Sequence, residues 1–294
     1  FDGCPNLKSI TVDEKNRTYA SENGVLFNKA KQWVMRCPPA TAGSYEIPKT
    51  VTHIGDHAFN GCTRLTSVSM PEGVVSIGNS AFRGCSSLGI ASMPQSVTTI
   101  GSFAFASCTK LVRISIPAGV RSISSFVFQG CKSLKSVELH DKVTSIGQSS
   151  FHGCSTITGL LLPQQLTSIG NHAFQGCSRL TGLTLPGKLT SIGRGAFSNC
   201  SGLTSMSIPD SVTTIPDHAF AGCSGFSQVR LGNRVTTIGG YAFSGCRQLK
   251  ELSIPDTLTT LGPGAFASCE SLQAVTLPAG INQPISTSTT SSGG

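Results

Sequence analysis

The sequence lacks the marks of a membrane-spanning, unfolded or leader segment. No apolar run reaches the roughly 18 residues that cross a bilayer, so we expect no transmembrane helix. The first residues, Phe1 to Cys4, are neither basic nor continuously apolar, so any secretion signal was removed or lies upstream. Charged residues make up only 12% of the 294 positions and hydrophobic residues 38%, a balance that predicts a packed protein.

Twelve cysteines suggest a disulfide framework until their spacing is considered. Ten of them follow one another at intervals of 23 residues: Cys62, Cys85, Cys108, Cys131, Cys154, Cys177, Cys200, Cys223, Cys246 and Cys269. Such regular spacing indicates an internal repeat. Because a repeat protein grows by adding neighbours to one continuous core, we expect a single domain.

Other residues share this period. A phenylalanine stands three residues before each of these cysteines, and an isoleucine or leucine stands five residues before each phenylalanine. A leucine follows each cysteine after three residues, with Ile157 and Phe226 as variants. The repeating unit reads L-x-x-V-x-L-P-x-x-V-T-x-I-G-x-x-A-F-x-G-C-x-x.

Two short extended segments are expected in each unit. In residues 65–70 the last two apolar side chains alternate with polar ones, which predicts a half-buried strand. Pro71 cannot donate to a ladder and therefore ends that strand. Residues 74–77 form a second extended segment, closed by Gly78.

A single helical turn is expected in the rest of the unit. Ala81, Phe82, Cys85 and Leu88 are spaced by one, three and three residues, which predicts the inward face of one α-helical or 3₁₀ turn. The residue before the cysteine suits a left-handed conformation, with asparagine as the best substitute for glycine. These residues are Gly61, Gly84, Gly130, Gly176 and Asn199.

The unit resembles the repeat of BspA-like leucine-rich-repeat proteins, found on the surfaces of bacteria and some protists. The resemblance covers residues 1 to about 281, and its A-F-x-G-C segment is specific to this subclass. It implies a right-handed solenoid with a parallel sheet on its inner face, used for adhesion to host or neighbouring-cell proteins. Periodicity predicts the solenoid, whereas the adhesive role comes from the resemblance alone.

The expected fold is therefore a mostly β member of the α/β repeat class. We predict a leucine-rich-repeat solenoid of about 12 repeats over residues 1–281, with short strands and short helical turns. Residues 282–294 are rich in serine, threonine and glycine and are expected to form a linker or tail.

An insertion interrupts the period between Cys4 and Cys62 and is placed within residues 13–41. Residues 24–28 and 32–36 flank a short polar stretch and predict a β-hairpin. The only tryptophan, Trp33, lies in this hairpin. Two interpretations stay open, namely an aromatic contact point for a ligand and a local core that braces the solenoid.

Stacking of the repeats would align the ten regularly spaced cysteines in one column, called the cysteine column. It is expected to be buried and reduced, because its neighbours are periodic and apolar and a buried thiol behaves as a small hydrophobe. Cys37 falls outside the period and is the expected reactive thiol. His172 and His218 share one position two repeats apart, about 10 Å, too far to bind one metal ion, and are expected at an exposed edge.

Basic residues gather in the seven positions after each cysteine. These segments contain only three acids, Glu138, Glu251 and Glu270. The segments therefore carry most of the net charge of +8. An electrostatic binding surface for an acidic protein or anionic glycan and a solvated face are both consistent with this pattern. The candidate ligand contacts are Lys110, Arg113, Lys132, Lys135, Arg179, Arg230, Arg247, Lys250 and, in the hairpin, Trp33, and Arg64 belongs to the same basic set.

The expected function is binding without catalysis. No serine, histidine and carboxylate set and no paired carboxylates recur where the repeat is interrupted, and we expect no cofactor and no metal. Nucleic acid is disfavoured because stacking aromatics are missing from the outward strand positions. We expect a monomeric module of a larger cell-surface or secreted protein that adheres to proteins or glycans. A passive spacer is the alternative.

Overall fold

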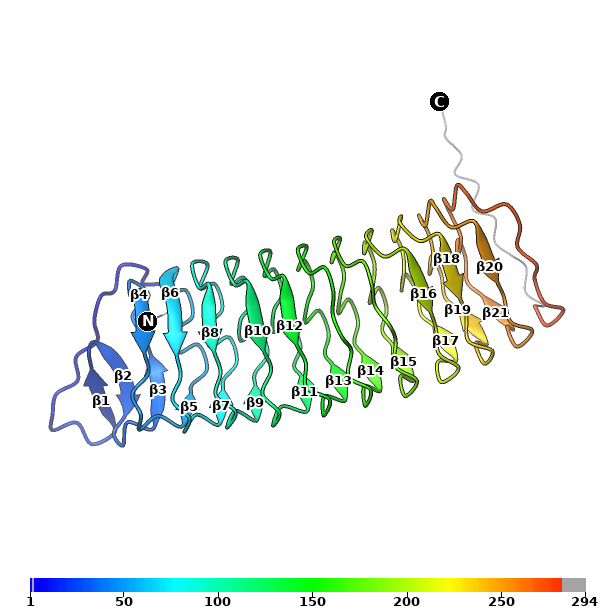
Figure 1. Ribbon diagram of the computed structural model, residues 1–294. Helices are drawn as coiled ribbons and strands as arrows, with labels where there is room; N and C mark the ends of the chain where they lie inside the picture. Colours follow the sequence, from blue (N-terminus) through cyan, green and yellow to red (C-terminus); the bar gives the residue numbers. More distant parts are fainter. Residues whose placement is uncertain (2, 282–294) are drawn as a thin grey trace, which may run out of the picture.

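The computed structural model describes residues 1 and 3–281, and it is an elongated solenoid whose turns stack side by side (Figure 1). About ten turns follow one another, one for each of the ten regularly spaced cysteines, rather than the 12 repeats expected. The described residues contain no helix, and hence none that could cross a membrane. The expected tail at 282–294 lies outside the described residues.

The first of two parallel sheets is formed by the L-x-x-V-x-L segments. Neighbouring strands pair in register one repeat apart, as in Arg113 with Ser136, and a bridge between Gly159 and Gly182 continues the row. Inward residues such as Val68 are buried, whereas the residues on either side point outward. The strands are β4 (Ala42–Glu46), β6 (Arg64–Ser69), β8 (Ile90–Ser92), β10 (Arg113–Ser115), β12 (Ser136–Glu138), β16 (Ser205–Ser207), β18 (Gln228–Arg230) and β20 (Glu251–Ser253).

The second sheet is formed by the V-T-x-I segments, which confirms the second extended element. Its outward hydroxyls hydrogen-bond along the stack, as between Ser122 Oγ and Ser145 Oγ at 2.7 Å. Its strands are β3 (Trp33–Arg36), β5 (His53–Ile54), β7 (Ser76–Ile77), β9 (Thr99–Ile100), β11 (Ser122–Ile123), β13 (Ser145–Ile146), β14 (Ser168–Ile169), β15 (Ser191–Ile192), β17 (Thr214–Ile215), β19 (Thr237–Ile238) and β21 (Thr260–Leu261).

The A-F-x-G-C segment forms consecutive tight turns, so the predicted helical turn is wrong. Cys177 N donates to Phe174 O within the turn, at 3.0 Å, whereas Phe174 N donates to Ala196 O of the next repeat, at 2.7 Å. Left-handed residues at His172 and Gly176 cause this alternation, because a helix needs right-handed residues throughout. The turns thereby form a third set of hydrogen bonds between repeats.

The core runs the length of the solenoid as a stack of phenylalanine rings. From Phe59 to Phe266 the rings of successive repeats lie 4.9 to 5.9 Å apart and nearly parallel. Each phenylalanine of this stack from Phe59 to Phe243 is at most 1% exposed. The inward positions predicted from the period are therefore confirmed, although the backbone that presents them is not helical.

The insertion is a three-stranded antiparallel meander that covers the N-terminal end. The predicted hairpin is confirmed, because β2 (Val25–Asn28) pairs antiparallel with β3. A further strand, β1 (Tyr19–Glu22), pairs with β2 across a turn in which Asn23 and Gly24 both have positive φ. This Asn-Gly pair is the usual signal for a two-residue hairpin turn and identifies the second hairpin.

Truncation of a stacked phenylalanine should be costly. We expect Phe174→Ala to lower the free energy of unfolding by about 3–5 kcal/mol, because the cavity removes contacts with rings on both sides. Urea denaturation followed by circular dichroism measures the loss. Arg179→Ala, an exposed change in the same turn, should cost less than about 0.5 kcal/mol, and equal costs for both would contradict the stacked core.

Removal of one whole repeat should be tolerated. Deletion of residues 157–179 joins Thr156 to Leu180, which occupies the position of Ile157, so all columns stay in phase. We expect a folded, shorter solenoid by circular dichroism and a cooperative thermal transition. Deletion of residues 160–179 shifts the columns and should abolish that transition. Similar damage from both deletions would contradict nearest-neighbour stacking.

Candidate binding surface

The basic residues lie where the chain leaves the cysteine turn and enters the first sheet. All of them are exposed, and because they fall in the same segment of the repeat, stacking brings them to one side of the solenoid. Arg113 begins β10 and Arg230 ends β18, so these two also occupy outward positions of the sheet. We call this set the basic strip: Arg64, Lys110, Arg113, Lys132, Lys135, Arg179, Arg230, Arg247 and Lys250.

The basic strip is not uniform along the solenoid. An N-terminal cluster gathers over the turns from β6 to β12, where Glu138 is the one acid in the same segments. A smaller C-terminal cluster is partly neutralised by Glu251 and by Glu270, whose Oε1 lies 3.5 Å from Arg247 Nε. The N-terminal cluster consists of Arg64, Lys110, Arg113, Lys132 and Lys135, the C-terminal cluster of Arg230, Arg247 and Lys250, and Arg179 lies between them.

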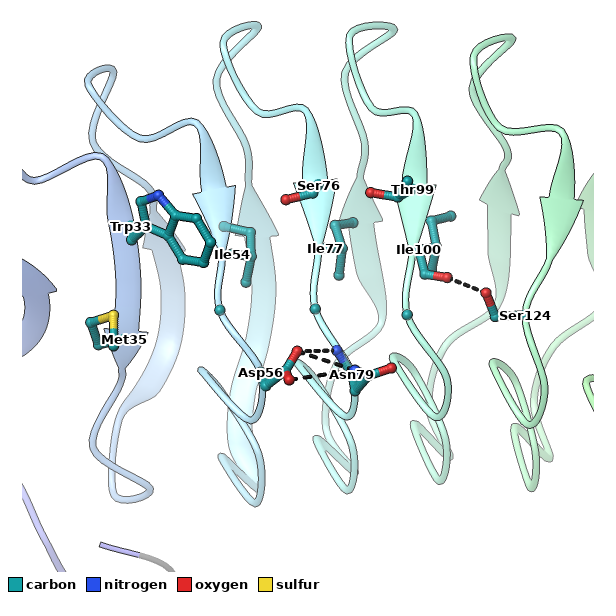
Figure 2. Close-up of a pocket in the computed structure, with 13 residues that line it drawn as sticks. Trp33, Met35, Ile54, Asp56, Ser76, Ile77, Asn79, Thr99, Ile100 and Ser124 are labelled. Carbon is teal, nitrogen blue, oxygen red and sulfur yellow. Dashed lines mark hydrogen bonds between the residues drawn. The ribbon is translucent and has the colours of Figure 1, made fainter.

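Trp33 lies in a different place from the basic strip. It belongs to β3 of the second sheet, is 43% exposed and stacks on His53 with ring centroids 4.4 Å apart. The sequence-predicted contacts therefore divide between two surfaces. Trp33 and Met35 form one end of a shallow trough of about 660 Å³ that crosses β5, β7 and β9 (Figure 2).

Polar groups in this trough are engaged in holding the repeats together. Asp56 Oδ1 accepts a hydrogen bond from Asn79 N at 2.7 Å (Figure 2). In the next turn, Asn79 Oδ1 accepts one from Ser102 N at 2.9 Å. Gly101 forms part of the floor, where a Cβ would lie 2.5 Å from Asn79 N. The polar side chains of this trough therefore have a structural role, in which their carboxylate and amide oxygens accept hydrogen bonds from backbone N–H groups of the following turn.

The cysteine column is buried, as expected, and its thiols have a regular hydrogen-bond partner. Each thiol from Cys85 onward donates to the carbonyl of the phenylalanine one repeat earlier, as Cys200 Sγ does to Phe174 O at 3.1 Å. Burial raises the pKa of Cys131 and Cys200 to about 12. These two thiols are therefore protonated at neutral pH. The column from Cys62 to Cys246 is buried, whereas Cys269 at its end is half-buried.

Cys37 lies outside the column, as its spacing indicated, but it is buried, so the prediction that it is the reactive thiol is wrong. It is fully buried, and Cys62 Sγ lies 3.9 Å from Cys37 O. Its own thiol approaches Thr41 Oγ1 at 3.3 Å, and its pKa is raised by the hydrogen bond with Cys62 and by burial. Its backbone takes the place of the repeated phenylalanine, because Cys37 N donates to Ala58 O just as Phe59 N donates to Ala81 O. Cys4 is exposed instead.

Two of the three histidines in the histidine column are less exposed than predicted, whereas the third, His57, is exposed. His172 and His218 are half-buried, and His218 stacks on Tyr241 with centroids 5.3 Å apart. The ring of His172 leans over Gly195, where a Cβ would lie 2.6 Å from His172 Nδ1. Among the described residues, no group of three or more histidines, cysteines or carboxylates is placed to hold a metal ion.

Two exposed aliphatic side chains on the first sheet were missed as candidate contacts. Ile90 is 63% and Leu161 90% exposed, at outward positions that carry mostly small or polar residues in other turns. The signal was in the sequence, because an aliphatic residue at an outward strand position departs from the repeat pattern. Their surroundings could not be read from the pattern alone.

Comparison with protein families identifies the repeat. The family model described as BspA type leucine rich repeat region matches residues 40–158, 98–226 and 192–289, which together span most of the chain. A comparison with curated proteins finds no match.

Solved bacterial structures share the fold. A leucine-rich repeat protein from Bacteroides ovatus is 24% identical with a TM-score of 0.58, and 87% of this chain and 84% of that chain are covered. A leucine rich cell surface protein from Faecalibacterium prausnitzii is 25% identical with a TM-score of 0.54, covering 89% of both chains. A leucine-rich repeat protein from Eubacterium ventriosum is 23% identical with a TM-score of 0.57, covering 82% of this chain and 79% of that chain.

Thiol reactivity should follow the burial of the cysteines. At pH 8 we expect Cys4 to react quickly with a chromogenic disulfide, because it is exposed, and Cys269 to follow, because the Cys246 thiol lowers its pKa. The remaining thiols should react only on unfolding, when all 12 become titratable.

Two serine variants separate the assignments. Cys4→Ser should remove the fast phase, and Cys37→Ser should leave it unchanged. A fast phase that survives in Cys4→Ser and disappears in Cys37→Ser would restore Cys37 as the reactive thiol. Fewer than 12 thiols in denaturant without reductant would contradict the reduced column.

Proposed function

The chain belongs to the family of BspA-type leucine-rich-repeat proteins, which are repeat scaffolds for interaction, and on this premise we propose that it is a non-catalytic binding module. It is displayed on a cell surface or secreted, and it adheres to an acidic protein or an anionic glycan through the basic strip. The similarity to a leucine rich cell surface protein of Faecalibacterium prausnitzii supports this location.

The distribution of charge is the observation that carries the proposal. Strands of adjacent turns lie about 5 Å apart, so cations one or two turns apart fall within roughly one Debye length at physiological salt. The N-terminal cluster therefore acts on a polyanion as a unit. It holds five cations and a single acid in its own segments, whereas acids lie beside the C-terminal cluster. We place the principal contact at the N-terminal cluster.

A passive spacer is the second candidate. The continuous ring stack and three sets of hydrogen bonds between repeats favour a stiff rod that would hold a neighbouring domain at a distance. The spacer needs no ligand, so binding experiments separate the two functions. Absence of binding to polyanions and to extracellular proteins supports the spacer.

Charge reversal tests the binding function. The probes are immobilised heparin and poly-aspartate, with affinity measured by surface plasmon resonance over a range of salt concentrations. We expect affinity to fall steeply with salt and to fall at least about tenfold in the double variant Lys110→Glu with Lys132→Glu. The pair Arg247→Glu with Lys250→Glu should have a smaller effect, because Glu270 and Glu251 already weaken the potential there.

A matched control keeps the same change of charge. Lys142→Glu with Lys188→Glu alters exposed lysines that follow, rather than precede, the first-sheet strands, and it should leave affinity unchanged. Circular dichroism confirms that every variant folds. Binding that ignores both salt and the reversals at the basic strip would contradict the proposal.

A further inference from the structure

Strand β8 has a small side chain facing the core and a large aliphatic one facing solvent, the opposite of the usual arrangement in this sheet. From Cys62 to Cys246 the turns place a large aliphatic residue or methionine inward at the middle of this strand, such as Val68 and Ile114, but β8 places Ala91 there. Its outward neighbour is Ile90, which is 63% exposed. The larger side chain of this pair therefore faces solvent and the smaller one faces the core.

The first sheet is interrupted beside this strand. One ladder joins β4, β6 and β8, and another joins β10 and β12, so within the described residues no backbone ladder connects β8 with β10. A groove of about 790 Å³ follows this seam and is lined by residues 89–93 and 112–115. The small Ala91 is one of these lining residues, and Ile90 and Val112 present aliphatic carbon at the surface of the groove.

Cations of the N-terminal cluster surround the same groove. Arg113 lines it directly. Lys135 N donates to Val112 O at 2.8 Å, which places Lys135 next to a lining residue, and Lys110 precedes Val112 by two residues. All three cations are exposed. An apolar groove rimmed by charge is the arrangement typical of a protein-recognition site.

Leu161 provides the contrast within the same sheet. It is 90% exposed, but its inward neighbour is Leu160, so this turn keeps a large inward side chain. Glu138 occupies the equivalent outward position one turn earlier. Exposed aliphatic carbon, a groove and cations therefore coincide at Ile90, whereas Leu161 has a carboxylate at the equivalent position of the preceding turn.

We propose that the β8–β10 seam is the anchoring site for an extended acidic polypeptide segment, which inserts one aliphatic side chain beside Ile90 and places carboxylates on Arg113, Lys110 and Lys135. This inference rests on the proposed function and selects its ligand class, because a glycan supplies anions but no aliphatic side chain. The cations attract and orient the segment, and the groove discriminates among acidic segments by their apolar residue.

The test compares two fluorescein-labelled peptides by anisotropy. One carries a single leucine flanked on both sides by aspartates, and the other carries serine in place of leucine. We expect the leucine peptide to bind the wild-type protein at least about tenfold more tightly, because burial of one leucine is worth this much. Ile90→Ser and Ala91→Val should both remove the preference, the first by deleting the apolar contact and the second by filling the groove.

Leu161→Ser is the matched control and should retain the full preference. Ala91→Val restores the residue type of other turns, so its folding is expected, and thermal melts verify it. Equal affinity of the two peptides for wild-type protein, or an unchanged preference in both Ile90→Ser and Ala91→Val, would overturn the seam as an anchor. The heparin measurement judges the proposed function separately, since heparin has no leucine and depends on the cations alone.

Discussion

The carbonyl group of the repeated phenylalanine is the point on which the stack depends. Phe174 O accepts the backbone N–H of Cys177 in its own turn and the thiol of Cys200 in the next. The first bond closes the turn and the second joins it to its neighbour, while the ring stacks in the core. A thiol suits this place because it is apolar enough to be buried and still donates weakly. The period of 23 residues must be kept because each partner has to reappear at the same height.

This constraint leaves only outward residues free to differ between turns. Inward positions hold the same few residue types from one end to the other, so the core carries no information about a ligand. Specificity for a ligand therefore depends on outward residues that differ from the repeat pattern. The N-terminal cluster and the reversed pair Ile90 and Ala91 are two such departures, and they fall in neighbouring turns of the same sheet.

The insertion illustrates how far a pattern can be extended and where it fails. The sequence located the interruption and one hairpin, and the spacing correctly placed Cys37 outside the column, but it did not indicate that this thiol is buried. In three dimensions Cys37 stands where the repeated phenylalanine stands in later turns, since its carbonyl accepts from the thiol of Cys62 as Phe59 O accepts from that of Cys85. Distance along the chain and position in the stack differ wherever residues are inserted. The Asn23–Gly24 turn was readable from local chemistry and needed no tertiary information.

The sequence by itself determined the period, the buried columns, the two extended segments and the set of exposed cations, because stacking forces residues one period apart into equivalent environments. The tertiary structure decided what depends on hydrogen bonding between turns. The expected helical turn is instead a series of tight turns, because residues such as His172 adopt a left-handed conformation. In this conformation alternate N–H groups donate to carbonyls of the next repeat. The tertiary structure also separated Trp33 from the basic strip and placed a groove between β8 and β10, since periodicity specifies which residues are equivalent but not where the ladder between turns is interrupted.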